Sequence, residues 1–324
     1  MKILIIRFSS LGDIVLTTPV IRCLKNQLEG VELHFLCKER MAPALGDNPY
    51  LSRVIFFDKH DRRLPAVLKE EQYDAVVDLQ NNRYSRRLVR RLGKKHLAFP
   101  KLDFRKLLLV LFKWNLMPDI HIVERYLEAV RPLGVCHDGK GLDYFLKEED
   151  FRRLDGFGLP AHYVAVAVGS QHATKQIPVE KLAEIKRLTR LPFVFLGDAR
   201  DALLVRELCA ESSAFNLCGQ LPLSVSAACI SRADFVLTGD TGLMHIASAL
   251  HKKTVSLWGN TVPQFGMYPY QPENREYVYI VENKTLCCRP CSKLGYSRCP
   301  LGHFKCMRGI PATKVADILN GKTE

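Results

Sequence analysis

The sequence has no apolar run long enough to cross a bilayer. The longest such run away from the N-terminus, residues 107–112, has a lysine on each side, whereas a spanning helix takes about 20 apolar residues. The run at residues 2–6 is too short for a secretory signal peptide. These absences argue against a membrane-spanning protein and predict a cytoplasmic one.

Several functional motifs are also missing. No G-x-G-x-x-G follows the first apolar run, which disfavours a nicotinamide oxidoreductase. The loops after predicted strands contain no clear Asp-x-Asp metal motif. Neither zinc-finger spacing nor a basic stretch interleaved with aromatic residues indicates nucleic acid, so we expect no nucleic-acid partner. With 47% hydrophobic and 25% charged residues, the composition is typical of a globular protein.

The net charge of +13 calls for an anionic partner. Positive charge is concentrated between residues 81 and 106, where acidic residues are scarce. Arg83, Arg86 and Arg87 recur there at helical spacing, so they are expected to share a face. Such a face suits an anionic acceptor or a lipid surface, and an ordinary solvated helix is the alternative.

Short apolar segments alternate with helical patterns through the first half of the chain. This alternation predicts a parallel, doubly wound sheet of the α/β class. Pro19 falls inside the first predicted helix and is expected to kink it slightly. The predicted strands are residues 2–7, 31–37, 54–57, 75–79 and 97–99, and the predicted helices are residues 14–28, 63–72, 83–92, 104–116 and 120–132.

The alternation stops at residues 134–160, which are rich in glycine and charge. Because domains commonly hold about 150 residues, we expect two domains, residues 1–155 and 156–324. The second half restarts the pattern and also reads as Rossmann-like. Its predicted strands are 163–168, 193–196, 215–217, 235–237 and 254–258, and its predicted helices are 179–189, 201–210, 224–231, 241–250 and 311–319.

Residues 236–250 carry the clearest functional signal, a strand followed by a tight turn and a helix. Asp240 stands where an N-cap is expected. Gly242 has no side chain to shield the N–H groups of the first turn, and such a helix start attracts phosphate. Thr241 and His245 lie near the same position. The alternative is an ordinary strand–turn–helix unit with a good cap.

Three more loops follow predicted strands, at the edge where open α/β sheets bind ligands. In Ser9-Ser-Leu-Gly-Asp13, the Asp13 carboxylate is either a helix cap or a general base. Lys175 is either a charge for a phosphate or a solvated loop lysine. Asp201 either binds ribose hydroxyls or caps a helix.

Most of the eleven cysteines are scattered, but five lie between residues 287 and 306. Cys288 and Cys291 form a C-x-x-C pair, and Cys299 and Cys306 follow closely. A structural Zn²⁺ held by these four thiols, a set of disulfides, and packed free thiols all remain open. We do not expect this cluster to be catalytic.

Together these motifs resemble the ADP-heptose:lipopolysaccharide heptosyltransferases, glycosyltransferase family 9. The resemblance covers nearly the whole chain, and the Cys-rich tail is similar to that of the heptosyltransferase II branch. The matching segments, in chain order, are residues 7–19, Lys175-Gln-Ile-Pro178, Asp240-Thr-Gly-Leu-Met-His245, residues 257–263 and residues 299–307.

The resemblance implies a GT-B fold, in which two Rossmann-like domains face each other across a cleft. It implies an inverting transfer of heptose from a nucleotide diphosphate donor, with ADP-heptose expected, to a lipopolysaccharide core acceptor. Neither a catalytic metal nor a cofactor is required. Asp13 matches the general base and Lys175 the phosphate-binding lysine. The donor-binding set is expected to be Gly12, Ser170, Asp201, Asp240, Thr241, Gly242 and His245.

The acceptor would then be an anionic, lipid-linked saccharide, and Arg83, Arg86 and Arg87 are the residues expected to bind it. Peripheral contact with the inner face of the inner membrane follows from such an acceptor. Two alternatives remain: a sugar-nucleotide epimerase of the same fold, and a non-catalytic protein that binds anionic glycolipid through its basic region.

Overall fold

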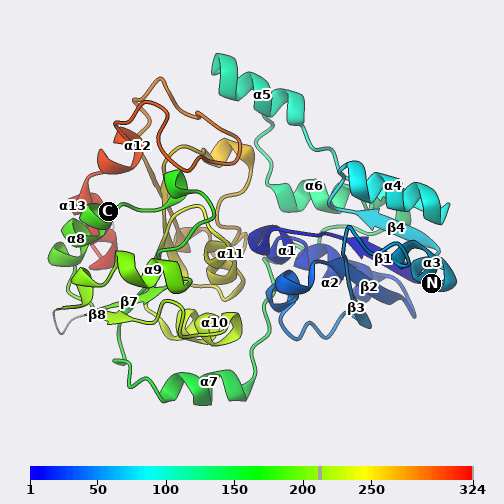
Figure 1. Ribbon diagram of the computed structural model, residues 1–324, viewed down its shortest axis with the longest axis horizontal. Coiled ribbons are helices and arrows are strands. Elements are labelled where there is room, and N and C mark those ends of the chain that lie inside the picture. Colours follow the sequence, from blue (N-terminus) through cyan, green and yellow to red (C-terminus); the bar gives the residue numbers. More distant parts are fainter. Residues whose placement is uncertain (211–213, 323–324) are drawn as a thin grey trace. The chain divides into compact units, whose positions relative to one another are not determined.

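The computed structural model describes residues 1–210 and 214–322, and the chain divides into two compact units (Figure 1). Unit 1 comprises Met1–Lys101 and Ile120–Phe145. Unit 2 comprises Leu102–Asp119 and Leu146–Glu324. Each unit is built around its own parallel sheet.

The sheet of unit 1 has the strand order β3-β2-β1-β4-β5, with all neighbours parallel. The central strand β1 pairs Ile5 with Phe35 on one side and Val77 on the other. Its apolar residues are fully buried, as expected for a parallel strand covered on both faces. The strands are β1 (Lys2–Ile6), β2 (Glu32–Cys37), β3 (Arg53–Phe56), β4 (Ala75–Asp78) and β5 (Lys95–Ala98).

Side chains alternate along β1, so helices are needed on both faces of the sheet. Leu4 and Ile6 pack with the buried residues of α3 and α4, while α2 lies beside α6. The predicted single helix at residues 14–28 is wrong, because Pro19 lies in the first turn of a second helix, where its missing N–H does no harm. The helices are α1 (Leu11–Val15), α2 (Thr18–Gln27), α3 (Leu64–Glu70), α4 (Arg83–Leu92) and α6 (Ile122–Glu128).

The sheet of unit 2 has the order β11-β10-β9-β6-β7-β8, again fully parallel. Its core joins Val166, Phe195, Leu237 and Leu257 from four neighbouring strands. The strands are β6 (Val164–Ala167), β7 (Phe193–Leu196), β8 (Ala214–Asn216), β9 (Phe235–Thr238), β10 (Lys253–Trp258) and β11 (Val278–Glu282).

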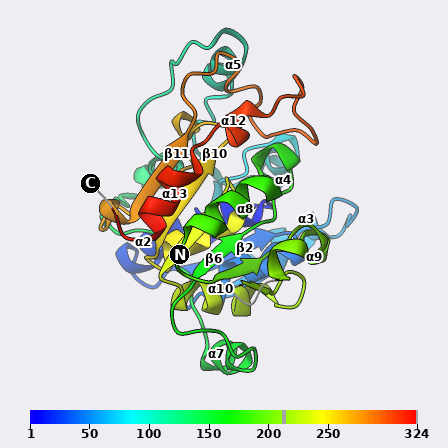
Figure 2. The same ribbon diagram turned by 90° about the vertical axis from the view of Figure 1, so that its left-hand side faces the viewer.

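Helices flank this second sheet, and Figure 2 shows α8 and α13 lying side by side. On the other side, α7 packs beside α10. The helices of unit 2 are α5 (Asp103–Phe112), α7 (Glu148–Asp155), α8 (Val179–Leu188), α9 (Ala199–Leu204), α10 (Leu223–Arg232), α11 (Gly242–Ala249), α12 (Lys305–Arg308) and α13 (Ala312–Leu319).

The predicted α/β class is confirmed, and each predicted strand has its counterpart in the structure. Strand β11 and helices α7 and α12 were not predicted. Helix α5 and the chain after it pack with unit 2, although the residues on either side of them belong to unit 1. Both α5 and α7 belong to unit 2, although they precede the domain boundary that was predicted after residue 155. Among the described residues, no helix combines the length and apolar character that a membrane span requires.

The two sheets share one topology, which fixes where a ligand can bind. In each unit the first strand lies beside the fourth, so the chain winds away from this point in both directions. Open α/β sheets bind ligands outside the carboxyl ends of the strands at such a switch point. The relevant ends are those of β1 and β4 in unit 1, and of β6 and β9 in unit 2.

Candidate active site

A lysine and a carboxylate meet at the switch point of unit 2. Lys175 ends the short 3₁₀ turn Ala173–Lys175 that follows β6, and Asp240 lies two residues beyond β9. Lys175 Nζ is 2.7 Å from Asp240 Oδ2, and the two side chains are only 16% and 12% exposed. Thr261 Oγ1 donates a 2.9 Å hydrogen bond to the same oxygen. The lysine charge is therefore held in place at the edge where a ligand would bind.

Gly239 lets these two loops approach each other. A Cβ atom at this position would lie 2.2 Å from the carbonyl oxygen of Lys175, a distance that no side chain tolerates. Glycine is needed wherever backbones pass this closely. Position 239 is therefore a direct requirement of the Lys175–Asp240 arrangement.

Helix α11 starts at Gly242, two residues after Asp240, and Asp240 is not its cap. The N-cap is Thr241, in an extended conformation, and its side chain makes no capping hydrogen bond. The predicted capping role of Asp240 is wrong because its carboxylate binds Lys175 and Thr261 instead. The first-turn N–H groups, beginning at Gly242, therefore lack a side-chain cap and are suited to an anionic ligand.

The other predicted donor residues of unit 2 lie around these loops. His245 is one turn into α11 and is buried. Ser170 is partly exposed in the loop after β6, and its carbonyl oxygen accepts from Gln176 Nε2 at 3.3 Å. The structure thus brings Lys175, Asp240 and Thr241 to one edge of the sheet, with Ser170 in the same loop as Lys175.

The Cys-rich tail supports the Lys175 turn. Thr174 and Tyr296 share three hydrogen bonds: Tyr296 N–H donates to Thr174 Oγ1 at 2.8 Å, while Thr174 N–H and Oγ1 donate to the Tyr296 carbonyl at 3.1 and 3.2 Å. Arg289 is buried and fixes the tail to the end of β10 through the carbonyls of Trp258 and Thr261, each at 3.1 Å. No local sequence pattern indicates these roles of Thr174 and Arg289.

The four cysteines of the predicted zinc site do lie together. They line one small cavity of about 30 Å³ with His303, and all are free thiols. Burial raises the pKa of the Cys306 thiol to about 11. Among the described residues, however, no three His, Cys, Asp or Glu side chains are grouped closely enough to hold a metal ion. Zinc at Cys288, Cys291, Cys299 and Cys306 therefore stays a prediction from spacing.

In unit 1, Asp13 lies at the carboxyl end of β1, in the first turn of α1. Its Oδ2 accepts from the Ser10 N–H at 3.0 Å and from Ser10 Oγ at 2.7 Å, which forms a capping box. Its Oδ1 lies 2.7 Å from Arg7 Nη2. The side chain is 18% exposed, so it lies at the surface of unit 1 and is not enclosed in its core. Gly12, next to it, is buried.

Arg7 determines the charge state of this carboxylate. Burial by itself raises the pKa of Asp13, but Arg7 and the Ser10 donors outweigh burial, so the pKa lies below its ordinary value. Arg7 is itself held by the carbonyl of Ser9, at 2.9 Å from Nε. Sequence reasoning missed Arg7, and its position as the first charge after the apolar strand was the available signal.

Asp201 has a different environment. It occupies the same position in the capping box of α9, where its Oδ2 accepts from the Asp198 N–H at 2.8 Å. The residue is 5% exposed, and a Cβ atom at Gly169 or Gly197 would lie 2.3 or 2.6 Å from its Oδ2. Burial raises the pKa of this carboxyl. Its geometry is accounted for by capping, and Asp198 is the N-cap residue.

The predicted acceptor-binding arginines lie on α4, whose start is capped by Asn82. Arg83, Arg86 and Arg87 are exposed. The opposite side of the helix, formed by Ser85, Leu88, Val89 and Leu92, is buried. The basic face predicted from the spacing is therefore present and accessible.

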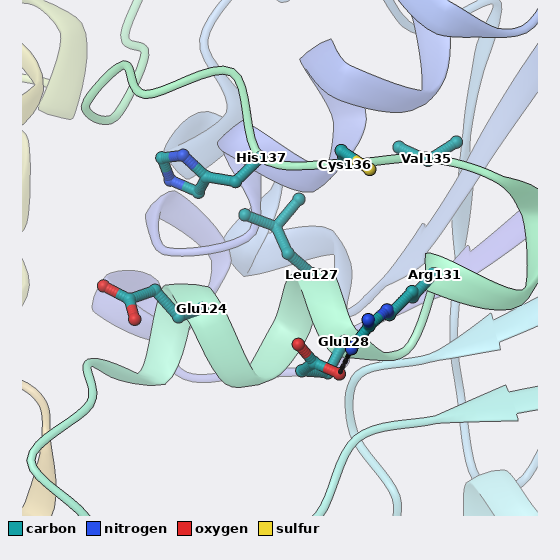
Figure 3. Close-up of a pocket in the computed structure, with 7 residues that line it drawn as sticks. All are labelled: Glu124, Leu127, Glu128, Arg131, Val135, Cys136 and His137. Atoms are coloured by element: carbon teal, nitrogen blue, oxygen red, sulfur yellow. Dashed lines mark ion pairs between the residues drawn. The ribbon is translucent and has the colours of Figure 1, made fainter.

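A separate hollow of about 440 Å³ lies on unit 1, between α6 and the loop at residues 135–137 (Figure 3). Glu128 and Arg131 form a 3.6 Å ion pair at its edge. None of the predicted site residues lines it. The hollow therefore does not belong to the site described above.

The two parallel, doubly wound units have the GT-B fold of solved heptosyltransferases. The sequence pattern of "Glycosyltransferase family 9 (heptosyltransferase)" matches residues 62–296. The chain therefore belongs to glycosyltransferase family 9, and the expected GT-B class and enzyme type are confirmed.

Relatives and solved structures agree with this assignment. The chain is 27% identical to lipopolysaccharide heptosyltransferase 1 of Pseudomonas aeruginosa, over 90% of this chain and 86% of that one. It is 25% identical to lipopolysaccharide heptosyltransferase 3 of Escherichia coli, over 77% and 80%. The E. coli ADP-heptose heptosyltransferase II structure superposes with a TM-score of 0.73 at 21% identity, covering 99% of this chain and 98% of that one.

A second structure, E. coli heptosyltransferase WaaC with ADP, gives a TM-score of 0.68 at 22% identity over the full length of both chains. The family 9 glycosyltransferase from Veillonella parvula gives 0.78 at 21% identity, covering 99% and 98%. At these identities the structures establish the fold.

Proposed function

We propose that this protein transfers a heptose from ADP-heptose to the core of a lipopolysaccharide acceptor, with inversion at the anomeric carbon. The observation that carries this proposal is the Lys175–Asp240 pair at the switch point of unit 2, close in sequence to the start of α11, where the N-cap side chain makes no capping hydrogen bond. The names of the relatives support the sugar and the acceptor, and the solved complex of WaaC with ADP-2-deoxy-2-fluoro heptose supports the donor.

Unit 2 would hold the diphosphate of the donor. The N–H groups at Thr241 and Gly242 would bind phosphate oxygens, and the positive end of the helix dipole would add to this attraction. Lys175 is already oriented by Asp240, so little reorganisation is needed when a phosphate oxygen competes for its ammonium group. These fixed charges stabilise the diphosphate as it leaves, which is the role that a divalent cation plays in other enzymes. The proposed reaction requires no cofactor.

Unit 1 would supply the general base. Because the pKa of Asp13 is lowered, its carboxylate is ionised at neutral pH and can accept a proton. The acceptor hydroxyl oxygen bonds to the anomeric carbon as the bond from that carbon to the diphosphate oxygen breaks. The hydroxyl proton passes to Asp13, and the nucleoside diphosphate leaves with the bonding pair.

The basic face of α4 would bind the acceptor. Arg83, Arg86 and Arg87 are exposed on one helix, and guanidinium groups bind phosphates and carboxylates through paired hydrogen bonds. An acceptor linked to lipid brings the protein to the inner face of the inner membrane. Peripheral contact with that surface is thus part of the proposal.

A two-stage experiment tests the function. The purified protein is first screened against nucleotide sugars, and ADP-heptose should raise the melting temperature more than UDP- or GDP-sugars, because a ligand that binds the native state stabilises it. The protein is then incubated with ADP-heptose, with and without a heptose-deficient lipopolysaccharide core and with a chelator present. Transfer to the core is expected. Altered donor stereochemistry without acceptor would instead identify an epimerase, and binding without any reaction a non-catalytic protein.

A further inference from the structure

Helix α5 of unit 2 presents its apolar side to solvent. Phe104, Leu107 and Leu111 follow one another at the i, i+3, i+7 spacing that places residues on one side of a helix. In a globular protein this side normally faces the core, yet here Phe104 is 71% exposed and Leu111 60% exposed. The outer apolar face of α5 consists of Phe104, Leu107, Leu111 and Phe112, and it continues into Trp114 and Leu116, which are also exposed.

The opposite side of α5 attaches the helix to unit 2. Leu109 is buried in a small apolar cluster with Val262 and Phe265. Lys113 Nζ donates a 2.7 Å hydrogen bond to the carbonyl of Pro290, and Lys293 Nζ lies 3.8 Å from Asp103 Oδ1. The helix is therefore attached through its other side, and none of the residues of the outer apolar face belongs to the apolar cluster around Leu109.

The residues around this face match an anionic surface. Cations at Lys101, Arg105 and Lys106 lie along the same segment, and one of the two acidic residues between positions 101 and 119, Asp103, is paired with a lysine. The rings of Phe112 and Trp114 lie 5.3 Å apart. Aromatic side chains next to lysine and arginine are typical of segments that lie in the headgroup region of a membrane.

We propose that the outer apolar face of α5, together with Trp114 and Leu116, docks on an anionic lipid bilayer. The apolar side chains enter the boundary between headgroups and acyl chains, and the neighbouring cations bind the headgroups. A second copy of this chain fits less well, because a symmetric dimer would place the same cations against each other. The docking surface is argued independently of the proposed function. Only its biological purpose, which is to bring the donor-binding unit to a lipid-linked acceptor, rests on that function.

Tryptophan fluorescence gives a direct test. The chain has two tryptophans: Trp114 is 61% exposed and Trp258 is 1% exposed. In a Trp258→Phe variant, Trp114 should shift its emission to shorter wavelength with vesicles that contain phosphatidylglycerol, and brominated acyl chains should quench it. Pure phosphatidylcholine vesicles should give a much weaker response. Unchanged emission with anionic vesicles would overturn the proposal.

A matched pair of variants controls for folding. Leu107→Ser with Leu111→Ser should weaken sedimentation of the full chain with anionic vesicles at least about tenfold, because two apolar side chains no longer leave water when the helix docks. Leu203→Ser with Leu204→Ser removes two exposed leucines from α9 of the same unit and should leave sedimentation unchanged. Equal vesicle binding by both variants contradicts the proposal. So does a change of the first variant from dimer to monomer without vesicles, which would identify a self-interface.

This test is independent of the sugar chemistry. Vesicle binding that is lost in the α5 variant, in a protein that transfers no heptose, would leave the docking surface standing and remove the proposed function. Heptose transfer to a detergent-dispersed core by a protein that does not bind anionic vesicles would support the proposed function and overturn the docking surface.

Discussion

Asp13 and Asp201 hold the same position in a capping box, one in each unit, but differ in burial and in charge partner. Each follows a strand and closes a capping box at the start of a helix. Asp13 keeps 18% of its side chain exposed and is paired with Arg7, whereas Asp201 is buried under Gly169 and Gly197. The pKa of Asp13 is lowered and that of Asp201 is raised.

This difference shows that the local pattern alone does not make a reactive carboxylate. A cap needs only an oxygen within reach of a backbone N–H. A general base must also be ionised at the working pH and reachable by a substrate hydroxyl. Arg7 and the remaining exposure favour both properties in Asp13, whereas burial works against both in Asp201. Each substitution below tests this contrast, or extends it to Lys175.

The largest effect is expected from Asp13→Asn. The amide keeps the size and one acceptor oxygen but takes no proton, so turnover should fall by about 10²- to 10⁴-fold, the range typical of general bases. Donor affinity, measured by calorimetry with ADP-heptose, should stay within about threefold of wild type. Asp201→Asn is the matched control and should retain most of the turnover. Near-normal turnover in Asp13→Asn would remove the proposed base.

Lys175→Ala should follow in size. Its ammonium group is expected to stabilise charge on the leaving diphosphate, and removing one such donor costs roughly 3–4 kcal/mol, or about 10²- to 10³-fold in kcat/KM for the donor. Lys181→Ala is the control, because Lys181 is also buried and paired with a carboxylate, that of Glu184 at 2.5 Å. If both variants lose activity equally, the role assigned to Lys175 is refuted.

Arg7→Met should change the pH profile more than the maximal rate. Without the guanidinium, the Asp13 carboxyl holds its proton to higher pH, so the acid limb of kcat/KM should move towards higher pH. Arg7→Lys keeps a charge and should move it less. In wild type, the lowered pKa of Asp13 stabilises the folded state at pH values above the unfolded-state pKa. This stabilisation is lost as pH falls through the folded-state pKa. An unmoved acid limb in Arg7→Met would contradict the pairing.

The smallest effect is expected from Asp201→Asn on stability. A raised folded pKa means that the ionised carboxylate is disfavoured in the folded state, so its contribution to stability falls as pH rises through the pKa. The amide carries no charge and still accepts from the Asp198 N–H. The variant should gain up to about 1 kcal/mol at neutral pH, and the gain should shrink as pH is lowered. Urea unfolding at pH 7 and pH 4 measures both, and a gain that grows at pH 4 would contradict the burial argument.

The two sheets could be predicted from the sequence because buried parallel strands appear as short continuous runs of apolar residues. The run at residues 2–7 became β1, and residues 193–196 became β7 without change. The motif at residues 236–250 likewise located the start of α11, because glycine and a β-prone run mark it locally. Strand β11 is partly exposed and was not recognised as such an apolar run.

The details of the site depended on contacts between distant segments, which a local pattern does not reveal. Asp240 was expected to cap α11, but its carboxylate forms an ion pair with Lys175, which lies 65 positions earlier in the chain. Arg7 and Asp13 are close in sequence, yet the pairing depends on how the strand end turns. Helix α5 could be predicted as a helix, but its attachment to unit 2 depends on Val262 and Phe265.

The most direct test of the central claim is the anomeric configuration of the product. The protein is incubated with ADP-heptose and a heptose-deficient core, and the new glycosidic linkage is examined by proton NMR, beside an Asp13→Asn reaction. The proposal predicts inversion relative to the donor, with the linkage nearly absent in the variant. Retention of configuration, or equal product from both proteins, would contradict it.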